Sequence, residues 1–290
     1  MQLLDPKNDY IFKRLFASAP ELLTELINAV RYDEEPVEVV EVLNPRIDPA
    51  DLAGKFIVLD VLARDRHGQL FNIEMQVRRF DGWSQRGTYY LANTLAKQLD
   101  SGDNYLELKP VIGIHLLDFD LFTAPEQLQQ AHWCFEMRDR WQPATRLGAE
   151  LQLNIIELAK ADRLQASTQA PNLAAWVAFF EHWKEESTMS QLAYPPVQQA
   201  LNKLKDLSAD SETQQRASVR ERALRDEVTQ VYAAEQRGKL EGLQEGKLEG
   251  KLEGLQEGKL EGLQEGLQRA LAKMIQSGMN EAQARAILGL

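Results

Sequence analysis

The sequence predicts a mixed α/β fold, because helix and strand patterns alternate along its N-terminal half. Apolar residues recur at roughly helical spacing early in the chain, two β-rich runs flank a turn sequence, and a strongly apolar run follows a second helical pattern. The expected helices span residues 6–30 and 83–99, and the expected strands span residues 37–43, 56–63, 70–77 and 110–117. The second helix is expected to turn Tyr90, Thr94 and residues 96–99 inward. This order is typical of α/β domains, in which helices cover the apolar face of a sheet.

The turn sequence at residues 65–68, Asp-Arg-His-Gly, determines how the two β-rich runs pair. It suits a type I turn that ends with its glycine in the left-handed conformation. The first residue of the turn then pairs with Gln69, and counting outward along both strands places Asp60 opposite Glu74. Gln76 lies on the same face, because side chains alternate along a strand. The spacing therefore predicts a cluster of polar groups on one sheet face.

Asp60 and Glu74 form a carboxylate pair that favours a metal site. Two carboxylates at a cross-strand distance repel each other unless a cation or a shared proton lies between them, and burying an unpaired charge is costly. Mg²⁺, or Mn²⁺ in its place, accepts one or two protein carboxylates, keeps several waters and takes further ligands from substrate phosphate. The pair therefore indicates phosphodiester hydrolysis. The alternative that spacing alone leaves open is a solvated polar sheet face.

Four segments near the N-terminus occur in an informative order. They are residues 5–13 (Asp-Pro-Lys-Asn-Asp-Tyr-Ile-Phe-Lys), residues 55–61, residues 72–76 (Asn-Ile-Glu-Met-Gln), and Arg86 with Tyr89 and Tyr90. Together they resemble the PD-(D/E)XK nuclease superfamily and, more narrowly, the Rpn family of recombination-promoting nucleases, also described as transposases. The resemblance covers roughly residues 1–125. It implies an α/β, restriction-endonuclease-like core of order α-β-β-β-α-β, followed by a helical C-terminal extension.

The resemblance also implies roles for individual residues. Asp60 and Glu74 would hold the metal, and Gln76 would position the attacking water or a metal-bound water. Gln76 replaces the lysine that the superfamily usually carries two residues after the glutamate, and an amide cannot donate positive charge. The candidates for accessory roles are the carboxylate of Asp9 and the ammonium groups of Lys13, Lys55 and Lys97.

A short basic and aromatic patch follows the second β-rich run. Arg78 and Arg79 precede Trp83 in the sequence, and Arg86 follows it. The three arginines are candidates for contacts to DNA phosphates. The chain as a whole carries 33 Lys and Arg against 44 Asp and Glu, a net charge of −11, so any DNA-binding surface must be local. The alternative for these arginines is that they are solubilising surface residues.

Length and composition allow one globular core with an extension. A chain of 290 residues with 44% hydrophobic content can bury a full domain and leaves material for a second, smaller region. We expect a nuclease-like core over residues 1–125 and a helical continuation packed on it over residues 126–207. Aromatic residues of the continuation, among them Trp141, Trp176 and Phe180, are expected to mark its buried faces. Residues 208–290 are expected to form a charged helix with repeats that serves oligomerisation or regulation.

The sequence also predicts a compartment. Cys134 is the only cysteine, which excludes an intrachain disulfide and fits a reducing cytoplasm. The N-terminal residues do not resemble a signal peptide, and no run approaches the roughly 20 apolar residues needed to span a bilayer. We therefore expect a cytoplasmic protein with no membrane partner.

Residues 238–266 carry a glycine at every fourth position, in tetrapeptides that read either Gly-Lys-Leu-Glu or Gly-Leu-Gln-Glu. The eight glycines would cost a helix about 6 to 8 kcal/mol relative to alanine. The glutamates, also four residues apart, would repel one another along it. The repeats are then a disordered tether, a product of repeat expansion without a selected function, or a helix that forms against a partner chain. We favour the last, which predicts a homo-oligomer.

The function predicted from the sequence is a metal-dependent DNA endonuclease linked to recombination, to transposon-like mobility or to defence against foreign DNA. An alternative is a catalytically inactive nuclease fold that serves as a DNA-binding or protein-interaction module, which the absence of the superfamily lysine makes credible. A third alternative is a structural scaffold assembled through the repeats. The carboxylate pair favours catalysis, because a pure binding module would not place two carboxylates where they repel phosphate.

Overall fold

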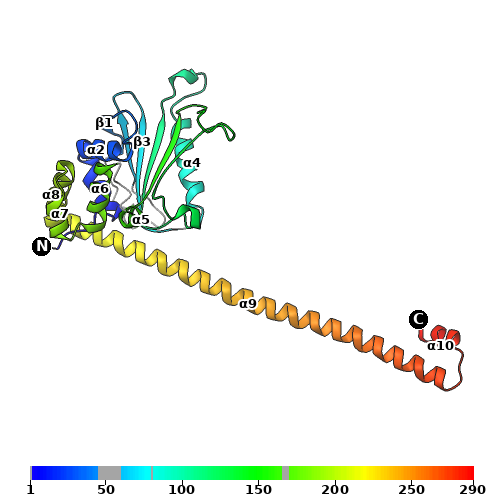
Figure 1. Ribbon diagram of the computed structural model, residues 1–290. Helices are drawn as coiled ribbons and strands as arrows, with labels where there is room; N and C mark the ends of the chain where they lie inside the picture. Colours follow the sequence, from blue (N-terminus) through cyan, green and yellow to red (C-terminus); the bar gives the residue numbers. More distant parts are fainter. Residues whose placement is uncertain (1, 45–59, 80, 165–169) are drawn as a thin grey trace. The chain divides into compact units, whose positions relative to one another are not determined.

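The computed structural model of the chain describes residues 2–44, 60–79, 81–164 and 170–290 (Figure 1). These residues form a six-stranded sheet with the strand order β1-β2-β3-β4-β6-β5. The strands are β1 (Val39–Val42), β2 (Val61–Asp65), β3 (Leu70–Gln76), β4 (Val111–Leu117), β5 (His132–Glu136) and β6 (Leu151–Glu157). Strands β3, β4 and β6 run parallel to one another, whereas β1–β2, β2–β3 and β5–β6 pair antiparallel. This confirms the predicted mixed α/β class.

Helices cover both faces of the sheet. The helices of the described residues are α1 (Asp9–Ala17), α2 (Pro20–Val30), α4 (Trp83–Ala96), α5 (Leu158–Arg163), α6 (Pro171–His182), α7 (Glu186–Gln191), α8 (Pro195–Ala209), α9 (Ser211–Gln276) and α10 (Glu281–Leu288). Helices α2 and α6 lie on one side of the sheet and α4 on the other (Figure 1). The larger apolar core lies on the side of α1 and α2, and two smaller clusters join α4 to the sheet.

The hairpin between β2 and β3 has the predicted register. Gly68 has a φ of 83°, and its N–H donates to the carbonyl of Asp65 at 3.1 Å. The Asp65 N–H donates to the Gln69 carbonyl at 3.1 Å, and Val61 pairs with Ile73. Residues 56–59 of the first β-rich run lie outside the described residues.

Two expectations about the helices are wrong in detail. The predicted helix over residues 6–30 is divided into α1 and α2, because Pro20 begins the second helix and the residue before a proline avoids helical geometry. The predicted second helix forms, but Tyr90 does not face inward as expected and is 49% exposed. Helix α4 instead buries Trp83, Gly87 and Leu91, which recur every four residues.

The helical continuation expected over residues 126–207 has its helices α5 to α8 from Leu158 onward, whereas the residues before them supply β5 and β6. Strand β6 pairs with β4 from Val111↔Leu151 to Leu117↔Glu157, so it continues the sheet. The prediction took Trp141 as a core marker of buried helix faces, but this side chain is 83% exposed. Aromatic content alone therefore did not distinguish edge strands and loops from helices. The aromatic residues of α6, including Trp176 and Phe180, are buried as expected.

The chain divides into two units, Met1–Arg225 and Asp226–Leu290. Residues 211–225, the beginning of α9, therefore belong to the same unit as the sheet. The second unit contains the rest of α9 with all eight repeat glycines in helical conformation. Its repeat leucines are each more than half exposed, namely Leu240, Leu243, Leu248, Leu252, Leu255, Leu260 and Leu263. No helix in the described part of the chain is both long and apolar enough to cross a membrane.

Candidate nuclease site

Asp60 lies at the start of the hairpin and is held by two asparagines. It directly precedes β2, where the register of the hairpin continues toward Glu74 on β3. Asn72 Nδ2 donates to Asp60 Oδ2 at 2.6 Å, and Asn44 Nδ2 lies 3.4 Å from Oδ1. Asn44 also accepts a hydrogen bond of 2.7 Å from the N–H of Leu62, which fixes the entry into β2. The carboxylate of Asp60 is therefore oriented from both sides.

Glu74 is the most electrostatically perturbed carboxyl group of the site. Its side chain is only 12% exposed, and burial raises its pKa to about 7. The positive charge of Arg86 opposes this shift, whereas the negative charges of Asp60 and Asp9 add to it. The carboxyl group therefore loses its proton near neutral pH, where a cation beside Asp60 would favour the ionised form.

His115 on β4 is the neighbour of Glu74 in the parallel pairing of β3 and β4. Its Nε2 lies 3.6 Å from Glu74 Oε2, and burial lowers the pKa of the imidazole to about 4. A neutral imidazole forms no ion pair, so the contact is polar without opposite charges. The edge of the ring meets Trp83 at a centroid distance of 5.2 Å. The contact between His115 and Glu74 was not predicted from the sequence, because the pairing of β3 with β4, two segments far apart in the sequence, brings His115 to the site.

Gln76 shares the sheet face of Glu74 but turns its amide toward the backbone. Its Nε2 donates to the carbonyl of Arg78 at 3.0 Å. This leaves the amide oxygen as the group that can accept a hydrogen bond from a water. The arrangement fits a side chain that orients water and adds no charge.

Asp9 and Lys13 lie one turn apart on α1 and are both buried, with exposed fractions of 7% and 6%. Both oxygens of Asp9 accept hydrogen bonds from Arg220 of α9, at 3.0 and 2.9 Å from Nε and at 2.6 Å from Nη2. The prediction did not include Arg220, because 211 residues separate it from Asp9. Lys55 lies outside the described residues.

The three arginines predicted to contact DNA have different environments. Arg78 is partly buried, and its Nη1 donates to the carbonyl of Leu224. Arg79 is exposed. Arg86 lies over the ring of the half-exposed Tyr90, 5.5 Å from its centroid, and its charge also acts on Glu74. Arg86 is thus the arginine that connects the carboxylate pair with the outer surface of α4.

The donors at this site fit a hard divalent cation. Asp60 and Glu74 supply carboxylate oxygens, which Mg²⁺ and Mn²⁺ prefer, and the mutual repulsion and burial that raise the pKa of Glu74 are effects that such an ion would offset. No cluster of three or more His, Cys, Asp or Glu residues suited to a metal occurs within the described ranges. Two protein carboxylates are sufficient for Mg²⁺, which keeps several waters.

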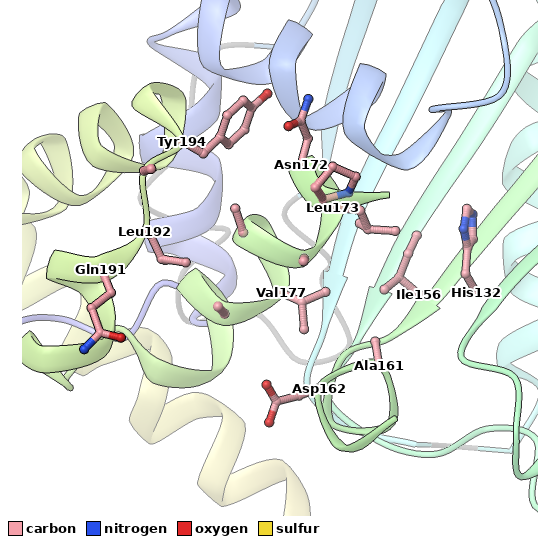
Figure 2. Close-up of a pocket in the computed structure, with 15 residues that line it drawn as sticks. His132, Ile156, Ala161, Asp162, Asn172, Leu173, Val177, Gln191, Leu192 and Tyr194 are labelled. Carbon is pink, nitrogen blue, oxygen red and sulfur yellow. The ribbon is translucent and has the colours of Figure 1, made fainter. Parts of the chain in front are cut away.

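A separate cavity of about 550 Å³ lies beside α5 and α6 (Figure 2). It is lined mainly by apolar side chains such as Leu173, Val177 and Leu192, with Asp162 and Tyr194 among the polar ones. None of the predicted site residues lines it. The cavity is therefore not part of the carboxylate site.

A mixed sheet that holds a carboxylate pair on a β-hairpin, with helices on both faces, places the chain in the class of α/β nuclease-like folds. The family model of the PD-(D/E)XK nuclease family transposase matches residues 6–234, and the chain belongs to this family. The predicted superfamily is thereby confirmed, and the match extends well beyond the 125 residues that carry the resemblance. The narrower resemblance to Rpn nucleases stays a prediction. No curated protein and no solved structure matches the chain.

Proposed function

We propose that the chain is a Mg²⁺- or Mn²⁺-dependent DNA endonuclease in which Asp60 and Glu74 hold the metal. The observation that carries the proposal is the proximity of these two carboxyl groups at one end of a hairpin, where the charge of Asp60 acts on Glu74, Asn72 orients Asp60 and burial perturbs Glu74. A carboxyl group whose pKa is raised by burial, as that of Glu74 is, beside a second carboxylate is typical of a functional site. Family membership supports DNA as the substrate.

A bound divalent ion would polarise the scissile phosphate and lower the pKa of a bound water. The protein groups have separate tasks in this proposal. Asn72 and Asn44 fix the direction of the Asp60 carboxylate, and Gln76 orients the attacking water through its amide oxygen. These contacts restrict the reacting groups to one geometry, which lowers the entropic part of the barrier.

Arg86 is our candidate for the positive charge that the missing lysine would have supplied. Its charge acts on Glu74, which requires that it lie near the metal-binding pair. Lys97, by contrast, is exposed at the C-terminal end of α4, several turns away from Arg86. Arg79 and Arg86 are exposed enough to contact DNA phosphates, whereas Arg78 contributes at least one donor to the fold itself.

The biological part of the proposal is DNA breakage in recombination, in transposon-like mobility or in defence against foreign DNA. A DNA substrate and a single cysteine fit a cytoplasmic setting. The exposed leucines of the repeats fit self-association of the second unit, which is the basis for proposing a homo-oligomer.

The competing proposal is an inactive nuclease fold that binds DNA or protein. Gln76 favours the inactive fold, because this residue lacks the charge of a lysine and its amide N–H donates to the Arg78 carbonyl. The carboxylate pair argues against it, since carboxylates without a cation repel phosphate. A scaffold assembled through the repeats is a third possibility and requires no metal at the sheet.

Cleavage of supercoiled plasmid tests the proposal. Wild-type protein is incubated with Mg²⁺ or Mn²⁺ and compared with Asp60→Asn, Glu74→Gln and an EDTA control. We expect nicking or linearisation by the wild type only, because both substitutions keep side-chain size and remove a ligand charge. DNA binding without cleavage in either metal would establish the inactive module instead.

A further inference from the structure

Helix α9 begins beside the nuclease site and contacts it at two points one turn apart. Arg220 binds Asp9 of α1, and the carbonyl of Leu224 accepts a hydrogen bond from Arg78. Residues four apart on a helix share one face, so a single face of α9 makes both contacts. The same face buries Thr213 and Ala217. We propose that Arg220 is a positioning residue of the nuclease site, an inference that rests on the proposed function.

The contact between Arg220 and Asp9 is buried and geometrically constrained. The two side chains are 2% and 10% exposed, and the guanidinium donates to both carboxylate oxygens. A planar guanidinium that binds both oxygens fixes the orientation of a carboxylate as well as its charge. Removing either partner takes away the counter-charge of a buried charged group, which is unfavourable. Asp9 therefore has its position set by a residue of α9.

The position of Asp9 matters because α1 packs against β2 and β3, the strands of the carboxylate pair. The charge of Asp9 acts on Glu74, so the two carboxyl groups lie within electrostatic range. Both oxygens of Asp9 already accept hydrogen bonds from Arg220, so Asp9 is not suited to replace Asp60 or Glu74 as a metal ligand. It is suited to accept a further hydrogen bond from a metal-bound water. This assigns Asp9 an outer-sphere role that Arg220 holds in place.

The second contact reaches the site from the end of β3. Leu224 accepts from Arg78, and the carbonyl of Arg78 accepts from Gln76 Nε2 at 3.0 Å. The residue that orients the attacking water in the proposed reaction is therefore connected to α9 through one intervening residue. Together the two contacts make the first turns of α9 part of the nuclease, although they follow the sheet in sequence by more than 50 residues.

The test uses full-length protein with the variants Arg220→Gln, Arg220→Lys and Asp9→Asn/Arg220→Gln. Arg222→Gln is the matched control, because Arg222 is exposed on the same helix and donates to the carbonyl of Ser218 in that helix. The measurements are Mg²⁺ affinity by calorimetry, kcat and KM for plasmid cleavage, and the thermal midpoint of unfolding.

We expect Arg220→Gln to lower kcat and Mg²⁺ affinity by about tenfold or more, as for losses of groups that orient metal ligands, with little change in KM. Arg220→Lys keeps the charge but not the bidentate geometry and should recover part of the activity. The double variant removes both buried charges, so it should regain thermal stability without regaining kcat. Arg222→Gln should behave as the wild type.

Two results would overturn the positioning role. The first is a folded Arg220→Gln variant with the kcat and Mg²⁺ affinity of the wild type. The second is a double variant that recovers kcat together with thermal stability, because this recovery is what a merely structural ion pair predicts. In both cases the wild type still cleaves DNA, so the proposed function stands. If the wild type neither binds Mg²⁺ nor cleaves DNA, the proposed function fails and the positioning role fails with it.

Discussion

Glu74 Oε2 lies 3.6 Å from His115 Nε2, and burial shifts the pKa values of these two groups in opposite directions. The pKa of Glu74 rises from 4.5 to about 7, and that of His115 falls from 6.5 to about 4. Between pH 4.5 and 6.5 the unfolded chain carries a proton on the histidine, whereas the folded chain carries one on the glutamate. The proton count of the pair is the same in both states, so its contributions to the pH dependence of stability cancel.

Glu74→Gln should expose the contribution of His115. The pKa of His115 is lower in the folded state than in the unfolded chain, so below pH 6.5 the unfolded chain binds a proton that the folded chain does not. The variant should therefore lose stability as the pH falls from 6.5 to 4. The loss should be about 3 kcal/mol relative to the wild type. Urea unfolding in EDTA at several pH values measures it.

His115→Gln should show the opposite trend. A raised pKa favours the folded state at low pH, and this effect disappears as the pH rises from 4.5 to 7, again by about 3 kcal/mol. If the unfolding free energy of both variants changes with pH in the same way as that of the wild type, the opposite pKa shifts of Glu74 and His115 are refuted.

Asn72 makes the shortest contact to Asp60 and should be needed for metal binding. Asn72→Ala removes the 2.6 Å hydrogen bond to Oδ2 and leaves Asn44 at 3.4 Å from Oδ1. We expect a loss of about 10- to 100-fold in Mg²⁺ affinity or cleavage, as for other groups that orient metal ligands. Calorimetry and plasmid cleavage measure the two quantities. Asn72→Asp, which keeps the size but adds a like charge, should be at least as severe, and full activity of either variant would contradict the role.

The extent to which the site follows from the sequence depends on how local its contacts are. The register of the hairpin between β2 and β3 was predictable, because the left-handed Gly68 and the alternation of the two strands fix it within a short segment. His115 and Arg220 were not predictable, because each reaches the site through pairing between segments far apart in the sequence.

The errors in the fold have one local and one non-local cause. Tyr90 was placed one position out of phase on α4, which rotates a side chain by about 100° and moves it from the core to the surface. Strands β5 and β6 were missed, because their burial depends on β4, to which β6 pairs across residues 118–150. Short aromatic and polar strands carry little periodic signal of their own.

Gly113 on β4 should not tolerate a side chain. An added Cβ would lie 2.9 Å from Leu153 Cδ1 and 3.1 Å from both Cδ atoms of Leu91 on α4. Gly113→Ala should therefore destabilise the protein by about 1 to 3 kcal/mol, the usual cost of overpacking. Urea unfolding of Gly113→Ala measures this loss, and Gly113→Ala/Leu91→Val should recover part of it by shortening the opposing side chain. Equal stability of Gly113→Ala and wild type would contradict the close packing of α4 on the sheet.

The glycines of the repeats offer a test of the proposed self-association. Gly246, Gly250 and Gly254 have open space around an added Cβ. Alanine at all three positions should therefore stabilise the helix by about 2 to 3 kcal/mol. Circular dichroism should show a higher melting temperature of the helix. If partner helices approach closely along the glycine row, the added methyl groups should also weaken association in sedimentation equilibrium. A simple tether predicts a more stable helix with unchanged association. We expect weaker association, because the exposed leucines of the repeats need a partner surface and the glycines permit close approach of a second backbone.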